Sequence, residues 1–155
     1  MCIRDRFVCN AQADAIVKDL PNVYKLKGVE SLTEIGITLT SAISKLSSSL
    51  KGPRRVCMDL ISDILLQHHA VQTRRCLSAL IPELRSEGFT IVGVMDPEMH
   101  SPQEVRAVLD LFDGEISIFE KETEKGPGKF LRIKKMSNQK YLGNEIALTK
   151  TSGLS

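Results

Sequence analysis

The sequence predicts an α/β protein of one domain: a mostly parallel sheet in a three-layer arrangement, with an antiparallel hairpin at its C-terminal end. Three observations lead to this prediction. The chain has 155 residues, of which 42% are hydrophobic and 26% charged, enough for one buried core. Strand-like and helix-like segments alternate along most of the chain, as they do in parallel sheets. Two alternating segments, residues 115–120 and 130–136, flank a Gly-Pro-Gly turn.

Strands and helices alternate in the first third of the chain. Residues 7–9 and 23–27 are short strand candidates, and residues 11–20 read as a helix that Pro21 ends. Ser31-Leu32-Thr33-Glu34 is a capping box that begins the next helix, because its serine and glutamate side chains satisfy free backbone donors. Gly52-Pro53 end that helix. Its apolar positions recur at helical spacing: Leu32, Ile35, Leu39, Ala42, Ile43, Leu46 and Leu50.

An apolar run over residues 54–66 lies at the centre of the chain and carries Asp59 directly after Val56-Cys57-Met58. A continuous apolar run is typical of a parallel strand buried on both faces. A carboxylate buried in mid-strand is costly without a partner. At the carboxyl end of a parallel strand it instead reaches the crevice where α/β proteins bind ligands. Asp59 is therefore the leading candidate for a functional residue.

The following segments complete the parallel part of the predicted sheet. Residues 71–87 read as a helix in which Pro82 is expected to introduce a kink. A buried strand over residues 89–95 ends at Asp96-Pro97. A second capping box, Ser101-Pro102-Gln103-Glu104, begins another helix and has proline at the first helical position.

The C-terminal hairpin carries opposite charges on its two strands. We expect acids of the first strand to face bases of the second, which contributes about 0.2–1 kcal/mol for each pair. The acids are Glu120, Glu122 and Glu124, and the bases are Lys129, Arg132 and Lys134.

The composition argues against several classes of function. A net charge of +2 is too small to indicate nucleic-acid or anionic-membrane binding by itself. No stretch reaches the roughly 18 apolar residues of a membrane span. The four cysteines lack metal-ligand spacing. A reduced, cytoplasmic protein with no membrane partner is expected.

The two ends of the chain are expected to lie outside the domain. Residues 1–6, Met-Cys-Ile-Arg-Asp-Arg, resemble a translated sequencing-adapter scar, so residues 7–146 form the predicted domain. Residues 147–155 are polar and are expected to be a flexible tail.

Each candidate residue also has a structural interpretation. Asp59 fits a Walker B acid, which holds Mg²⁺ through water beside a nucleotide, but many strands end with an aspartate that caps the next helix. Asp96 could add a second carboxylate at the same edge of the sheet, or could start a turn. His68-His69 and His100 read as loop or cap histidines. Lys134-Lys135-Met136, with Lys140, is a basic patch or a solvated edge strand.

The order and content of these segments resemble the archaeal KaiC-like ATPases of the RecA superfamily of P-loop NTPases. The resemblance covers residues 7 to about 146. The Asp113-Gly114 pair before the first hairpin strand and the Lys135-Met136 pair at the end of the second are its most specific features. It implies a RecA-like core that lacks its first strand and its phosphate loop.

The resemblance assigns roles to individual residues. Asp59 matches the Walker B acid and would hold Mg²⁺ through water. Asp96 falls near the position that senses the terminal phosphate. Lys135-Met136 matches a Lys-Met-Arg motif that reaches the nucleotide of a neighbouring subunit, and Ser137 stands at the arginine of that motif. ATP and Mg²⁺ are implied for the parent protein, and tight binding to this chain is not expected.

Departures from the family pattern affect hydrolysis. No G-x-x-x-x-G-K-[ST] phosphate loop occurs in the chain, and Asn10-Ala11-Gln12 stand where active members have glutamates that activate water. Serine cannot replace arginine in stabilising phosphoryl charge.

The sequence therefore predicts part of an ATP-binding regulatory protein that does not itself hydrolyse ATP. The parent is expected to self-associate through RecA-like interfaces and to act on a regulatory or DNA-related partner. The alternative is a degenerate, non-catalytic scaffold in signalling or transcriptional regulation. A receiver-like domain that is phosphorylated on Asp59 would need an acidic pair and a lysine, which Asn10-Ala11-Gln12 and Met95-Asp96-Pro97 do not supply.

Overall fold

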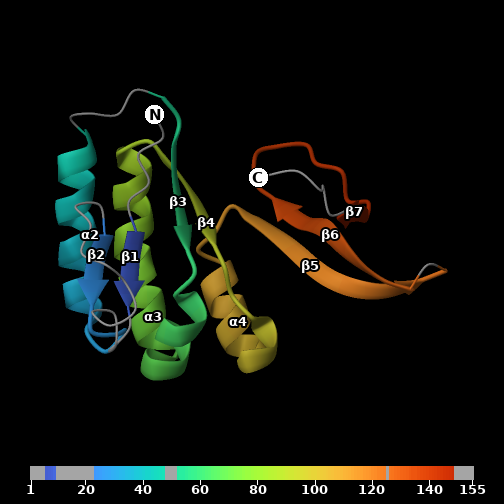
Figure 1. Ribbon diagram of the computed structural model, residues 1–155, viewed down its shortest axis with the longest axis horizontal. Helices are drawn as coiled ribbons and strands as arrows, with labels where there is room; N and C mark the ends of the chain where they lie inside the picture. The colour runs from blue at the N-terminus through green and yellow to red at the C-terminus, as the bar shows by residue number, and fades with distance from the viewer. Residues whose placement is uncertain (1–5, 10–22, 48–51, 125, 149–155) are drawn as a thin grey trace. The chain divides into compact units, whose positions relative to one another are not determined.

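The computed structural model describes residues 6–9, 23–47, 52–124 and 126–148 (Figure 1). The chain divides into two compact units, residues 1–108 and residues 109–155. The helix expected over residues 11–20 lies outside the described residues.

The first unit contains two pairs of parallel strands. Strand β1 (Arg6–Cys9) pairs with β2 (Val23–Leu26), and β3 (Arg54–Met58) pairs with β4 (Phe89–Gly93). All four strands were expected from the sequence. Within the described residues, the two pairs form separate two-stranded sheets, whereas the sequence predicted one continuous parallel sheet.

Helix α2 (Leu32–Ser47) begins where the first capping box predicted, with the backbone N–H of Glu34 donating to Ser31 Oγ at 3.2 Å. Its apolar stripe is also confirmed over the described residues: Ile35, Leu39, Ala42 and Ile43 are buried.

Helix α3 (Ile61–Ser86) joins two helical segments, and the second of them matches the helix predicted over residues 71–87. The first segment begins at Ile61, so the apolar run after Asp59 is helical rather than part of the strand. This helix is interrupted at His69, whose φ of 56° and ψ of 175° are not helical. The helix therefore has a kink at His69; Pro82, where the sequence predicted one, lies inside the second helical segment. Dihedrals of this kind are common only for glycine, so the backbone is strained at His69.

The core of the first unit joins both helices to one face of the β3–β4 pair. Leu39 and Ile43 of α2 pack with buried leucines of α3 and with alternate residues of both strands. A second cluster joins Leu26 of β2 to Ile35 and Ile64. The members of the first cluster from α3, β3 and β4 are Leu80, Leu84, Val56, Met58, Phe89 and Ile91.

The opposite face of the β3–β4 pair is open, which corrects the prediction of a strand buried on both faces. Arg55 and Cys57 of β3 are exposed, and Val92 of β4 is 54% exposed. Helices thus cover one face of this pair in the described part of the chain, and the third layer that the sequence predicted is not seen there.

Helix α4 (Pro102–Leu109) follows a short 3₁₀ turn, η1 (Pro97–Met99). The second capping box is confirmed in both directions. The backbone N–H of Glu104 donates to Ser101 Oγ at 3.4 Å, and Ser101 donates to Glu104 Oε2 from its N–H at 3.2 Å and its hydroxyl at 2.9 Å. Arg74 Nη1 donates to the carbonyl of Ala107 at 2.6 Å and so joins α4 to α3.

The second unit is an antiparallel sheet in the order β5 (Gly114–Thr123), β6 (Gly126–Met136) and β7 (Ile146–Leu148). The predicted hairpin is confirmed. Strand β7 pairs with β6 and extends two residues into the region expected to be a flexible tail.

The charge pairing of the hairpin follows the prediction at one pair. Lys129 Nζ lies 3.5 Å from Glu120 Oε1 across the strands. Lys134 instead contacts Glu115 at 2.9 Å, because the register shifts between Glu115 and Ile116. Two other predicted members face uncharged partners: Glu122 lies opposite Pro127, and Arg132 lies opposite Ser117.

Substitution of Leu84 tests the core. Leu84 is fully buried between α2 and the strands, so Leu84→Ala should lower the free energy of unfolding by about 2–5 kcal/mol. The control is Leu66→Ala on the same helix, where the leucine is 50% exposed and the loss should stay below about 1 kcal/mol. Urea unfolding followed by circular dichroism measures both, and equal losses would contradict this packing.

The capping box of α4 gives a pH dependence. Hydrogen bonds from the Ser101 hydroxyl and backbone N–H lower the pKa of Glu104, and nearby His69 and His100 lower it further. A carboxyl group whose pKa is lower in the folded state stabilises the fold above its unfolded pKa of about 4.3. That stabilisation is lost as the pH falls through the lower folded value.

We therefore expect the Glu104→Gln variant to be less stable than the parent at pH 7 and to approach it in stability as the pH falls below about 4. Thermal unfolding midpoints at a series of pH values measure the difference. A difference that stays constant over this range would show that Glu104 does not titrate as described.

Candidate functional site

The carboxyl edge of the β3–β4 pair gathers the predicted acids of the first unit. Met58 pairs with Gly93, and the N–H of Val94 donates to the carbonyl of Met58 at 2.9 Å. Asp59 is the first residue after β3, and Asp96 follows β4 three residues beyond Gly93. Because the strands are parallel, both acids leave the sheet at the same edge, as expected from the sequence.

Ser62 joins the two loops at this edge. It lies in the first turn of α3, and its hydroxyl oxygen accepts a hydrogen bond from the N–H of Asp96 at 2.9 Å. The sequence analysis did not select Ser62. Its only local signal is a hydroxyl three residues after Asp59, and the contact spans 34 residues of sequence.

Asp96 caps the 3₁₀ turn η1 at this edge. Its Oδ1 accepts from the N–H of Glu98 at 3.0 Å and so caps η1, which agrees with the turn interpretation. This leaves its second carboxylate oxygen for a ligand. Asp59 is exposed to solvent just beyond β3. Two carboxylates therefore lie on neighbouring loops, one of them engaged in a cap.

Carboxylates of this kind are among the ligands that Mg²⁺ prefers, and the predicted magnesium–nucleotide site stays a prediction. Mg²⁺ usually keeps several waters and binds proteins through one or two carboxylates together with substrate phosphates. Asp59 can supply such a contact through water. Among the described residues, no group of three histidine, cysteine or acidic side chains is arranged to hold a metal. The sequence also lacks a phosphate loop, so the phosphate half of the site does not fit the residues present.

The base of the hairpin positions the candidates of the second unit. Lys135 pairs with Glu115, and the N–H of Ser137 donates to the carbonyl of Asp113 at 2.6 Å. Gly114 pairs with Met136, so the two features most specific to the family resemblance lie opposite each other.

Gly114 allows this close approach. A Cβ at this position would lie 2.9 Å from Met136 Sδ and 3.2 Å from the carbonyl oxygen of Lys135. A glycine is therefore favoured here, because a Cβ would require the Met136 side chain and the Lys135 carbonyl to shift.

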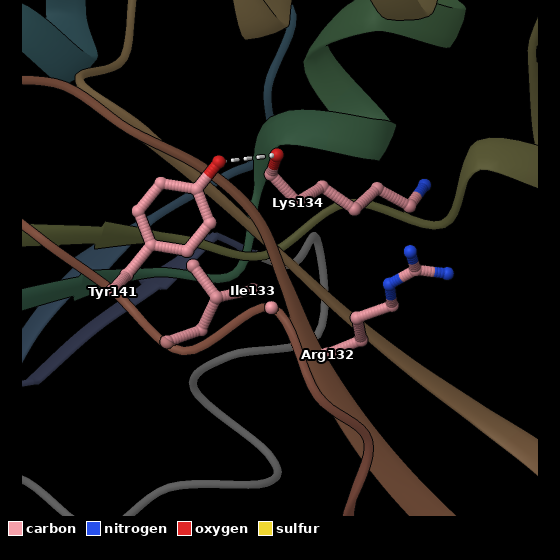
Figure 2. A pocket seen from close by; sticks show the side chains of 5 residues that line it. Arg132, Ile133, Lys134 and Tyr141 are labelled. Carbon is pink, nitrogen blue, oxygen red and sulfur yellow. Dashed lines mark hydrogen bonds between the residues drawn. The ribbon is translucent and has the colours of Figure 1, made fainter.

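An open hollow of about 330 Å³ lies beside β6 in the second unit (Figure 2). Tyr141 lies against Ile133, and its hydroxyl donates to the carbonyl of Lys134 at 3.2 Å. The Arg132 and Lys134 side chains extend in a similar direction in this view, and the Lys134 ammonium already contacts Glu115. None of the four candidate residues lines this hollow.

The histidines serve the fold. His68 Nε2 lies 2.7 Å from the carbonyl oxygen of Val29 and joins α3 to the segment before α2. His100 follows η1 at its C-terminal cap, as the cap interpretation predicted.

Residues 7–118 match a family of unknown function, DUF7504. The chain belongs to this family. No curated protein matches the DUF7504 chain.

Among solved structures, the chain is similar to the KaiC-like protein PH0186 from the hyperthermophilic archaeon Pyrococcus horikoshii OT3, with a TM-score of 0.57 and 17% sequence identity. The similarity covers 81% of this chain and 57% of that protein. The chain thus spans somewhat more than half the length of the KaiC-like protein. At this identity the likeness concerns the fold alone, and at that level it confirms the KaiC-like RecA fold that the sequence resemblance implied.

Among the helices that the structure describes, none has the length and apolar character needed to cross a membrane.

Gly114→Ala tests the base of the hairpin. The added methyl group would press on Met136 and on the backbone of Lys135, so we expect a loss of about 1–3 kcal/mol in the free energy of unfolding. The matched control is Gly143→Ala, since a Cβ at Gly143 meets nothing within 4 Å. Chemical unfolding measures both variants, and a Gly114 variant as stable as the Gly143 variant would contradict the close approach.

Proposed function

We propose that this chain is the later part of an ATP-binding regulatory protein with a KaiC-like RecA fold, and that the chain itself does not hydrolyse ATP. The observation that carries the proposal is the position of Asp59 and Asp96 at the carboxyl edge of adjacent parallel strands. Ligands of open α/β sheets bind at this edge. The similarity to a KaiC-like protein over 81% of the chain supports the same reading.

In this proposal, the first strand and the phosphate loop precede the part of the protein seen here. The chain spans 57% of the KaiC-like protein, and its sequence contains no phosphate loop. The complete protein would bind ATP in a ring or dimer and use that binding to switch a regulatory or DNA-related partner. Asp59 would hold Mg²⁺ through water, and Asp96 would lie near the terminal phosphate.

Hydrolysis is not part of the proposal, because phosphoryl transfer depends on positioning and on electrostatic stabilisation of the phosphate. Ser137 stands where the family motif has arginine, and a hydroxyl brings neither the charge nor the two-pronged geometry of a guanidinium. Lys135, which pairs with Glu115, is the remaining cation of that motif.

The second candidate is a non-catalytic scaffold. It is favoured by the cap that Asp96 makes with Glu98, because a carboxylate engaged in local structure is less available to a nucleotide. In this case, the edge of the β3–β4 pair would be maintained for folding alone.

Nucleotide binding to the 155-residue chain separates the two candidates. We expect a fluorescent ATP analogue to bind weakly, with Mg²⁺ strengthening the binding. Asp59→Asn should weaken the Mg²⁺-dependent part about tenfold, equivalent to about 1.4 kcal/mol. Asp110→Asn is the control, because Asp110 is an exposed aspartate outside the predicted site.

Two results would contradict the proposal. Absence of Mg²⁺-dependent binding at millimolar nucleotide would favour the scaffold. ATP hydrolysis by the parent chain that Asp59→Ala abolishes would show that the chain is itself a catalyst.

A further inference from the structure

The stretch from the end of β4 through α4 is attached to α3 at two points. At its start, the N–H of Asp96 donates to Ser62 Oγ at 2.9 Å. Near its end, Arg74 Nη1 donates to the carbonyl of Ala107 at 2.6 Å. Helix α3 is interrupted at His69, which lies between Ser62 and Arg74. Each helical segment of α3 therefore holds one end of this stretch.

Burial does not fix the Asp96 end of the stretch. In the described part of the chain, the side chains of residues 96–99 are exposed, and Met99 is 48% exposed. Among the described residues, the Ser62 hydroxyl is the one side-chain group from another element that bonds to residues 96–99. The position of Asp96 thus depends on hydrogen bonds rather than on apolar packing.

Two hydrogen bonds hold Asp96, one at its backbone and one at its side chain. Ser62 Oγ accepts from its backbone N–H, and its Oδ1 accepts from the N–H of Glu98 at 3.0 Å. The first bond fixes where the residue begins, and the second fixes how its carboxylate is turned. Together they orient the remaining carboxylate oxygen.

We propose that Ser62 is a positioning residue, whose hydroxyl holds Asp96 so that its carboxylate is oriented at the edge of the β3–β4 pair before a ligand arrives. The effect of this link on ligand binding rests on the proposed function. A group that is already held in its bound position loses less conformational freedom on binding, so the link strengthens binding. Ser62 acts through Asp96 and does not itself contact the ligand.

A purely structural role for Ser62 makes a different prediction. If its hydroxyl only satisfied a backbone donor, its loss would affect ligand binding equally with and without the Asp96 carboxylate. If Ser62 acts through Asp96, the two residues are coupled, and a double-mutant cycle measures that coupling.

The first experiment needs no nucleotide and follows amide hydrogen exchange by NMR. In Ser62→Ala, exchange at the N–H groups of Asp96 and Glu98 should become about threefold faster or more, as expected for the loss of one net hydrogen bond. The N–H of Val94, which donates to the carbonyl of Met58, is the internal reference and should be unchanged. Ser62→Thr keeps the hydroxyl and should keep the parent rates.

The second experiment measures Mg²⁺-dependent binding of a fluorescent ATP analogue to the whole 155-residue chain. Ser62→Ala should weaken this binding about threefold to tenfold, the range of one net hydrogen bond. In the Asp96→Asn background, which removes the charge but keeps an oxygen for the cap, the same change should have little effect. Ser78→Ala is the matched control, because Ser78 is an exposed serine of α3 outside the candidate site.

Three results would overturn the inference. Exchange at Asp96 and Glu98 that is unchanged in Ser62→Ala, or that rises equally at Val94, rules out local positioning by Ser62. Equal weakening of binding with and without the Asp96 charge shows that Ser62 does not act through Asp96. A threonine variant that behaves like the alanine variant shows that the hydroxyl is not responsible.

The inference and the proposed function can fail separately. A parent chain that binds no nucleotide contradicts the proposed function, while the exchange experiment still decides whether Ser62 positions Asp96. Conversely, nucleotide binding that depends on Asp59 but not on Ser62 supports the proposed function and contradicts the inference.

Discussion

Parallel pairing of β3 with β4 is the constraint on which the first unit depends. Two neighbouring parallel strands cannot be joined by a tight turn and need a long crossover, which α3 supplies. Arg54, at the start of β3, contacts the chain where it returns from α3 to β4. Its Nη1 donates to the carbonyl of Glu87 at 2.7 Å, and its guanidinium lies 5.9 Å from the centre of the Phe89 ring. These contacts hold the start of β3 beside the start of β4. The ends of both strands, and the loops that carry Asp59 and Asp96, then have to emerge together.

In the described part of the chain, helices cover only one face of the β3–β4 sheet. Parallel sheets in proteins usually have both faces covered, because the crossover helices pack on them. Here α2 and α3 pack against the face that carries Val56 and Ile91. Val92 and Cys57 lie on the other face, which is exposed. Over the described residues, this sheet has two strands and one exposed face, so it buries little apolar area by itself. Packing of the helices on the other face therefore contributes most of the buried apolar area that stabilises the pair.

Local signals in the sequence predicted local structure well. The second capping box forms in both directions and the serine of the first caps its helix, because each contact needs only groups three residues apart. The strands bounded by glycine and proline lie where the pattern placed them. The helical start of α3 was missed because periodicity cannot distinguish a buried strand from a buried helix in a short apolar run. The break at His69 agrees with the loop interpretation of His68-His69, although a histidine gives no local sign of a positive φ.

In the candidate site too, the sequence predicted local features but not contacts between distant segments. Asp59 could be placed at a strand end because the apolar run before it is unambiguous. Ser62 could not be selected, since its role exists only when the loop after β4 folds over the first turn of α3. Gly114 was selected through the family resemblance, and only the structure shows that a Cβ there would crowd the Met136 side chain on the facing strand. A single sequence does not show which distant segments are in contact.

The distribution of charge within each unit is the basis on which we propose binding rather than catalysis. In the first unit, the edge of the parallel pair offers Asp59 and one oxygen of Asp96, both negative and suited to a hydrated cation. In the second unit, Lys134 contacts Glu115, Lys135 lies across from the same glutamate, and Ser137 adds a hydroxyl without charge. Stabilising a transferring phosphoryl group requires positive charge that is not already neutralised by a neighbouring carboxylate. Glu115 partly neutralises Lys134, which weakens the field that this lysine could apply to a phosphate. In our proposal, the edge of the β3–β4 pair holds a metal-bound ligand, whereas the base of the hairpin, taken by itself, lacks the concentrated positive charge that phosphoryl transfer requires.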